Sequence, residues 1–158
     1  MTEISPSMKR VQEALDQSGL SLEVVELPQS TRTAQEAATA VGCELGQIVK
    51  SLVFRGSDTD KPYLVLVSGA NRANLGRVGQ FTGEPVQMAG ADFVRERTGF
   101  SIGGVAPVGL PEPIPILVDQ DLMRYEIIWA AAGTPRSVFC LSPDNLLELT
   151  AGQVGSID

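Results

Sequence analysis

The chain has 158 residues, of which 43% are hydrophobic and 20% are charged. This length and this proportion of hydrophobic to charged residues predict a single globular domain over residues 1–158 with a sizeable core, and they exclude a disordered chain. No apolar run reaches membrane-spanning length, and Met1–Ile4 does not begin a signal peptide, so we expect a cytoplasmic protein that does not associate with membranes.

Net charge and the absence of histidine exclude several functions. The formal net charge of −7 argues against non-specific binding to DNA, which needs many Lys or Arg contacts with phosphates. With no histidine in the sequence, Ser–His–Asp triads, Cys–His pairs and histidine-based zinc sites are excluded. We therefore expect no metal and no cofactor. Any catalysis must use lysine, carboxylates, hydroxyls, backbone dipoles or the substrate itself.

Apolar residues at helical or alternating spacing, bounded by Pro, Gly and polar turns, predict the elements of the first half. Thr33 with Glu36 three residues later is a capping box. In chain order, the expected elements are a helix from Ser5-Pro6 to Gly19, a strand over Leu22–Leu27, a helix over Ala34–Val41, hairpin strands over Ile48–Arg55 and Pro62–Ser68, a short helix through Val78 and a short strand over Pro85–Met88.

The second half follows the same pattern around a glycine-rich stretch. Its expected elements are a helix over Asp92–Arg97, the stretch Thr98–Gly109, a stiff connector over Pro111–Pro115, a strand over Ile116–Val118, hairpin strands over Glu126–Ala131 and Ser137–Leu141, a helix over Asp144–Leu149 and a loose tail over Ala151–Asp158. Strands in hairpin-like groups between short helices favour one α+β domain with a mixed or largely antiparallel sheet.

Two features are candidates for chemistry. In the Ile48–Arg55 strand, alternation places Lys50 in line with Ile48, Leu52 and Phe54. A lysine in such a row either reaches the rim of the sheet or points into a pocket as a point charge for a carbonyl, phosphate or carboxylate. The stretch Thr98–Gly109 has four glycines, one proline and no charged residue. It offers backbone N–H and C=O groups to a ligand, although such runs are more often plain connecting loops.

Three segments in register carry a resemblance to a known family. Lys50–Phe54, Thr98–Gly109 and Ile116–Asp119 resemble the YbaK/EbsC family, which includes the editing domain of bacterial prolyl-tRNA synthetase and its free-standing relatives. The likeness extends from about Thr33 to Leu149. It implies a mixed sheet curled into a partly closed barrel, with short helices around it.

The resemblance also implies a function, the hydrolysis of the ester in mischarged aminoacyl-tRNA. We expect a free-standing, trans-editing deacylase that acts on tRNA for proline carrying a small non-cognate residue such as Cys, Ala, Ser or Thr. A prolyl-tRNA synthetase or an elongation factor is the expected partner. A non-catalytic module that binds aminoacyl-adenosine or a small anionic ligand remains the alternative.

The resemblance assigns roles to residues of this chain. Lys50 is expected to position the substrate, while the Gly-x-x-x-Pro backbone faces it and orients or stabilises the ester without a protein nucleophile. The expected catalytic residues are Lys50, Gly103, Gly104, Val105, Ala106 and Pro107. The expected substrate-binding residues are Thr31, Arg32, Thr33, Leu52, Ser68, Asn71, Arg72, Ile102, Gly109 and Asp119.

Overall fold

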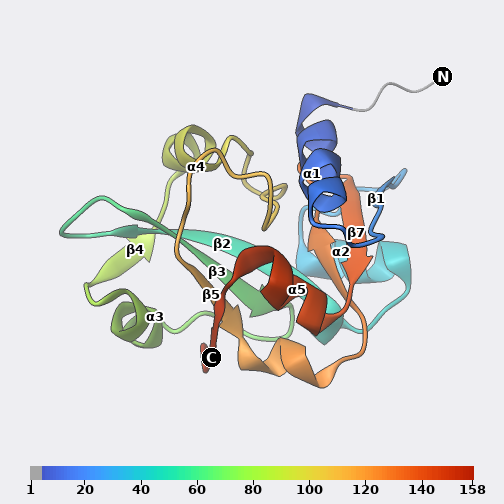
Figure 1. The fold of residues 1–158 in the computed structure, drawn as a ribbon. Helices are drawn as coiled ribbons and strands as arrows, with labels where there is room; N and C mark the ends of the chain where they lie inside the picture. Colours follow the sequence, from blue (N-terminus) through green and yellow to red (C-terminus); the bar gives the residue numbers. More distant parts are fainter. Residues whose placement is uncertain (1–4) are drawn as a thin grey trace.

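A computed structural model describes residues 5–158 as an α+β fold built on one mixed sheet (Figure 1). Residues 1–4, which carry the expectation about a signal peptide, lie outside the described residues. The strands follow the order β1-β7-β6-β2-β3-β5-β8, and β4 also pairs with β2. Their bounds are β1 Val24–Glu26, β2 Ile48–Gly56, β3 Pro62–Ser68, β4 Val86–Met88, β5 Ile116–Asp119, β6 Ile128–Ala131, β7 Ser137–Leu141 and β8 Gln153–Gly155.

Strand pairing confirms the α+β class with a mixed sheet. The two predicted hairpins, β2 with β3 and β6 with β7, are antiparallel. Three other pairs are parallel, namely β2 with β6, β3 with β5, and β5 with β8. Within residues 5–158 the end strands β1 and β8 do not pair with each other, so the sheet stays open.

Local sequence signals place the helices. Ser5 Oγ accepts the Met8 N–H at 3.2 Å, and Thr33 and Glu36 form the predicted capping box. None of the helices in the described part has the length and apolar content that a membrane crossing requires. The helices are α1 Pro6–Gln17, α2 Ala34–Val41, α3 Leu75–Thr82, α4 Ala91–Thr98 and α5 Pro143–Thr150, with short 3₁₀ segments at Leu45–Gln47 and Gln120–Arg124.

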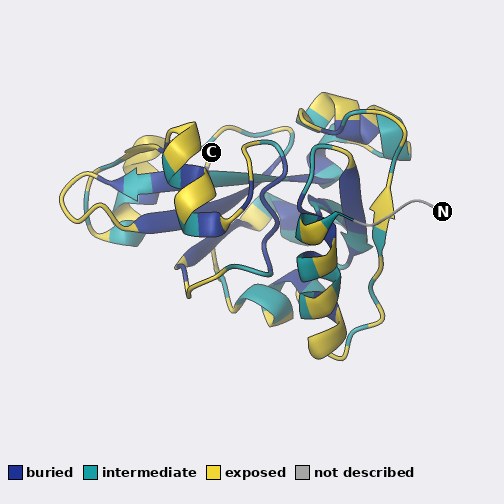
Figure 2. Ribbon diagram, turned by 90° about the horizontal axis from the view of Figure 1, so that it is seen from above, coloured by how far each residue is buried: buried dark blue, intermediate teal, exposed yellow. Residues whose placement is uncertain are grey.

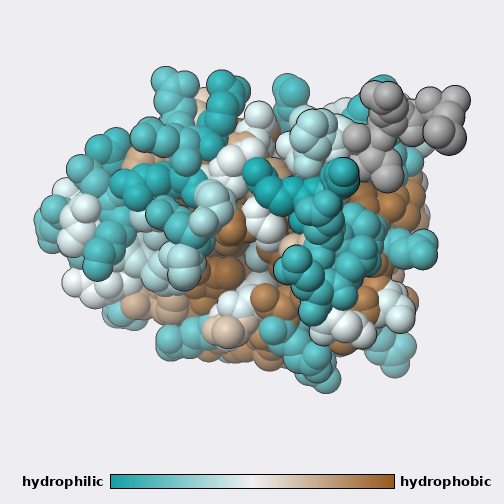
Figure 3. All heavy atoms as spheres, turned by 45° about the horizontal axis from the view of Figure 1, so that its top comes forward, coloured by the Kyte–Doolittle hydropathy of each residue, from teal (hydrophilic) through white to brown (hydrophobic). Residues whose placement is uncertain are grey.

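The core lies on both faces of the sheet (Figure 2). On β2, Val49 and Val53 belong to the larger hydrophobic cluster, while Phe54 packs in a second cluster with Val65 and Val67. This division follows from strand alternation, which sends successive side chains to opposite faces. On the face shown in Figure 3, hydrophilic residues surround hydrophobic ones that are visible in the middle.

The expectation of a loose C-terminal tail is wrong. Gln153–Gly155 forms β8, which pairs in parallel with β5, and Ile157 is only 1% exposed. The Asn74 N–H donates to the Ile157 carbonyl at 2.8 Å. The tail is ordered because β5 offers it a strand edge and a hydrophobic cluster accepts Ile157, two long-range partners that the tail's own composition does not indicate.

Candidate functional site

A cavity of about 320 Å³ lies between β2, β6, α2 and the loop over residues 102–105, and we call it the Lys50 cavity. Its wall is largely apolar, with Lys50 and Arg32 as its charged side chains. A wall of this kind, with few polar groups, is typical of sites for small ligands. Of the predicted site residues, those that line it are Thr31, Arg32, Thr33, Lys50, Leu52, Ile102, Gly103 and Val105.

Lys50 is half-buried, and its ammonium donates a hydrogen bond to the backbone carbonyl of Asn71. Removal of water lowers the pKa of Lys50, and the positive charge of Arg72 lowers it further. Asp119 and Asp158 oppose these effects and raise the pKa, but the net direction is downward. The side chain is therefore held by the Asn71 carbonyl at the edge of a partly desolvated cavity.

The Asn71 carbonyl is held by a network behind Lys50. Asn71 Nδ2 donates to Asp119 Oδ2 at 3.0 Å and to Asp121 Oδ2 at 2.7 Å. Asp119 is 1% exposed and also accepts the Ser68 N–H at 3.0 Å. Ser68, Asn71 and Asp119, predicted to bind substrate, thus lie outside the lining of the cavity and brace Lys50 through the Asn71 backbone. Arg72, also outside the lining, is exposed.

The glycines of the loop permit close approach to distant segments. A Cβ on Gly103 would lie 2.8 Å from Arg32 Cγ, and its φ of +91° disfavours any other residue. A Cβ on Gly104 would lie 2.9 Å from the Thr134 backbone. The Gly104 N–H already donates to the Ser101 carbonyl at 2.9 Å. By contrast, the N–H groups of Gly103 and Val105 have no hydrogen-bond partner within the described part of the chain.

The end of the predicted catalytic loop lies elsewhere. Ala106 is fully buried in the larger hydrophobic cluster. Pro107 and Gly109 line a second cavity of about 710 Å³, between α1, the proline-rich connector and α5. The structure therefore places Gly103 and Val105 in the lining that includes Lys50, leaves Gly104 and Ala106 outside that lining, and places Pro107 at another cavity.

Several lining residues were not predicted as site residues. Most of them are apolar or small, and strand periodicity cannot separate a core position from a cavity wall. Trp129, the one tryptophan of the sequence, also lines the cavity. The unpredicted lining residues are Ala34, Ala37, Ile48, Val49, Ser51, Trp129, Ala130, Ala131 and Val138.

The arrangement suits a ligand that carries a carbonyl or an anionic group beside a small apolar part. Lys50 offers a positive charge, and the N–H groups of Gly103 and Val105 can donate to a negatively charged oxygen. Within residues 5–158, no group of three or more Cys, Asp or Glu side chains is placed to hold a metal ion.

Known proteins resemble this chain over most of its length. Residues 28–149 match the aminoacyl-tRNA editing domain family. The uncharacterised protein YwhH of Bacillus subtilis is 32% identical over 148 residues, which cover 94% of each chain. A candidate Cys-tRNA(Pro)/Cys-tRNA(Cys) deacylase of Enterococcus faecalis, EbsC, is 29% identical over 79% of this chain and 76% of that protein.

Solved structures and multidomain enzymes extend the comparison. The crystal structure of a candidate trans-editing enzyme for prolyl-tRNA synthetase superposes with a TM-score of 0.92, with 54% identity and 99% of each chain covered. Proline–tRNA ligase of Thermosipho melanesiensis is 33% identical over 70% of this chain, but the match spans only 19% of that enzyme.

Proposed function

The chain belongs to the aminoacyl-tRNA editing domain family and is an aminoacyl-tRNA deacylase, and we propose that it acts in trans on mischarged tRNA for proline. The amino acid removed would be a small non-cognate residue such as Cys, Ala, Ser or Thr. One observation carries this proposal: Lys50 lines the same largely apolar cavity as Gly103 and Val105, whose N–H groups have no hydrogen-bond partner in the described part of the chain.

The proposed mechanism relies on orientation and backbone dipoles. Lys50 holds the terminal phosphate or ribose of the tRNA so that the ester lies within the cavity. The N–H groups of Gly103 and Val105 orient the ester or the attacking water, and they stabilise negative charge as it develops on the carbonyl oxygen. Water adds to the carbonyl carbon, the bond to the ribose oxygen breaks, and the ribose hydroxyl leaves. No side chain of the protein forms a covalent bond with the substrate.

A delivery partner follows from the charge of the chain. With a net charge of −7, the protein alone should hold tRNA weakly. We therefore propose that prolyl-tRNA synthetase or an elongation factor presents the charged tRNA, in the cytoplasm where both act. The similarity to a candidate trans-editing enzyme and to part of a proline–tRNA ligase supports the synthetase as the first partner to test.

The first test is a panel of purified tRNAs for proline charged with Pro, Ala, Cys, Ser or Thr. Wild-type protein should hydrolyse at least one non-cognate ester and spare prolyl-tRNA. Lys50→Ala should reduce deacylation about 100-fold, because misplacing a substrate by about 1 Å has an effect of that size. Lys50→Met keeps most of the aliphatic stem and should show a similar loss, since it also lacks the charge.

A lysine at another site provides the matched control. Lys61 is exposed in the turn between β2 and β3, outside the cavity lining, so Lys61→Ala should keep wild-type activity. If no charged tRNA is hydrolysed, the deacylase proposal is wrong, and binding without hydrolysis would support a binding module. Equal rates in wild type and Lys50→Ala would remove Lys50 from the mechanism.

A further inference from the structure

One edge of β2 is unpaired in its middle. β6 pairs with β2 at Ile48 and Val49, and β4 pairs with it from Phe54 to Gly56. Just after β4 ends, the Ala89 N–H donates to the Val53 carbonyl at 3.0 Å. Between these two partners, no strand within residues 5–158 pairs with this edge.

The direction of the backbone groups shows which residue faces the gap. Along a strand, the N–H and C=O of successive residues point alternately to opposite edges. The Ile48 carbonyl accepts from Gly69, which follows β3, whereas the Val53 carbonyl accepts from Ala89, which follows β4. The register with β3 runs from Val49 to Arg55 without a bulge. Ser51 therefore directs its N–H and C=O away from β3 and into the gap.

Ser51 has no hydrogen-bond partner for these groups in the described part of the chain. Its hydroxyl oxygen is buried and also lacks a partner there. The residue as a whole is nevertheless partly exposed, so the exposed area belongs to its other atoms. Unpaired main-chain groups beside a cavity are expected to find a partner in water or in a ligand.

Two cavities meet at Ser51. It lines the Lys50 cavity and also a smaller cavity of about 50 Å³, which shares Leu52, Ile102 and Val105 with the larger one. The remaining wall of the smaller cavity is apolar. A space of this size beside the strand edge would hold a short side chain and little more.

We propose that the aminoacyl group of the substrate docks on Ser51 as a single-residue β-bridge, an inference that rests on the deacylase function proposed above. The α-ammonium donates to the Ser51 carbonyl, and the ester carbonyl accepts the Ser51 N–H. The short side chain enters the 50 Å³ cavity.

The short length of the unpaired edge of β2 favours a single aminoacyl group over a longer peptide. Between the positions paired with β6 and β4, Ser51 is the only residue whose two main-chain groups both lack a partner within residues 5–158, so the gap has room for one residue. An aminoacyl ester carries one ammonium donor and one carbonyl acceptor separated by one Cα, as a residue of a neighbouring strand does. A longer peptide strand would collide with the flanking strands β6 and β4.

The same contact assists hydrolysis. When water adds to the ester carbonyl, its oxygen becomes negatively charged, and a hydrogen bond from a backbone N–H strengthens as that charge develops. The Ser51 N–H would thus act directly on the reacting oxygen. It would add to the stabilisation of that oxygen that we propose for the Gly103 and Val105 N–H groups.

Ser51→Pro is the direct test, because proline is the one natural residue that lacks the N–H in question. Proline is tolerated on a strand edge whose N–H makes no ladder bond, so the β2–β3 pairing should survive, and thermal unfolding would verify this. Ser51→Ala is the reference, since it removes the hydroxyl and keeps both main-chain groups. We expect kcat/KM of Ser51→Pro to be 100-fold or more below that of Ser51→Ala, the typical loss for one oxyanion donor.

A substrate analogue tests the ammonium contact without altering the protein. The best substrate of the panel is compared with the tRNA ester of the same acid lacking its amino group, and each rate is divided by the spontaneous hydrolysis rate. We expect the analogue to lose at least 10-fold in this ratio with wild-type protein.

The outcomes separate the two proposals. If wild type hydrolyses a mischarged tRNA but Ser51→Pro stays within threefold of Ser51→Ala, the β-bridge is wrong and the deacylase function stands. An analogue processed as well as its parent ester would also overturn the β-bridge. Absence of hydrolysis by wild type overturns both proposals.

Discussion

At the scale of single residues, the surroundings of Lys50 set the pKa of its ammonium group. Burial and Arg72 lower its pKa, against the opposing pull of Asp119 and Asp158. Because the folded pKa lies below the usual value, Lys50 should lose its proton, and the enzyme its activity, at a lower pH than an ordinary lysine would. Arg72→Gln should move this midpoint upward, and Arg77→Gln, which removes a charge that does not shift Lys50, should leave it in place.

Lysine-labelled ¹³C NMR can measure this midpoint, since the chain has only three lysines and Lys50→Met identifies the relevant signal. A Lys50 midpoint at or above the ordinary value would contradict the desolvated environment, and no change in Arg72→Gln would contradict the coupling.

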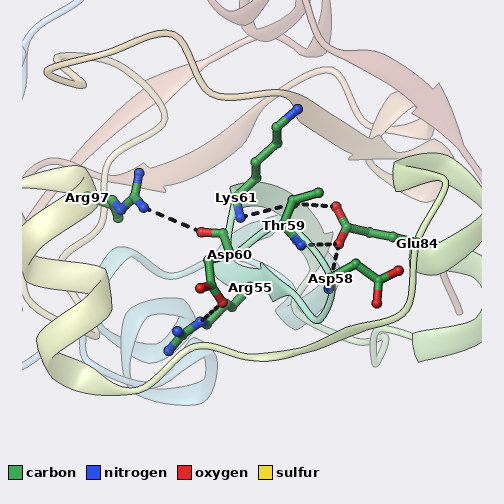
Figure 4. Close-up of polar contacts among 7 residues, drawn as sticks. All are labelled: Arg55, Asp58, Thr59, Asp60, Lys61, Glu84 and Arg97. Carbon is green, nitrogen blue, oxygen red and sulfur yellow. Dashed lines mark hydrogen bonds and ion pairs between the residues drawn. The ribbon is translucent and has the colours of Figure 1, made fainter.

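At the scale of elements, Glu84 ties the turn of the β2–β3 hairpin to the segment before β4 (Figure 4). Its carboxylate accepts the backbone N–H of Asp58 at 3.0 Å, the Thr59 hydroxyl at 2.6 Å and the Tyr63 hydroxyl at 2.7 Å. The bonds from Thr59 and then Tyr63 lower the pKa of Glu84 to about 2. A depressed carboxylate pKa stabilises the fold above the unfolded pKa, and this contribution disappears as the pH falls toward the folded pKa.

Glu84→Gln should therefore lower Tm at pH 7, and the difference from wild type should shrink between about pH 4.5 and pH 2. Thermal scans across this range test the prediction. Glu96→Gln serves as the control, because Glu96 is exposed on α4 and has no side-chain hydrogen bond within residues 5–158. A Tm difference for Glu84→Gln that stays constant with pH would show that ionisation is not its cause.

At the scale of the whole molecule, an acidic protein must bind an acidic substrate. Arg32 lines the cavity and Arg72 approaches Lys50, while Arg97 is paired with Glu112. We expect tRNA affinity to fall with salt, with a slope of about −0.7 in log K against log salt for each phosphate contact. Arg32→Gln should reduce this slope by about 0.7, whereas Lys9→Gln should not change it, because Lys9 is exposed on α1 and lies outside the cavity lining. Fluorescence anisotropy at several salt concentrations measures the slope, and binding insensitive to salt would contradict contacts between these arginines and phosphates.

The sequence by itself determined much of this protein. Capping boxes and turn residues located helices and hairpins, and alternation placed Lys50 among apolar neighbours on one face of β2. The family likeness over most of the chain indicated the editing function. These signals are local, or they lie in motifs whose order along the chain can be recognised without knowing the tertiary contacts.

Only the tertiary structure decided what lies beside each strand. Periodicity shows which face a residue occupies, but the partner at a strand edge depends on which distant segments pair. The sequence therefore could not show that β6 and β4 leave Ser51 unpaired, or that Asn71 and Asp119 lie behind Lys50. Nor could the sequence show that Gly103 and Pro107, which belong to one short segment, line two different cavities. The physical reason is that cavities and unpaired edges arise where packing between remote elements stops, which no single segment encodes.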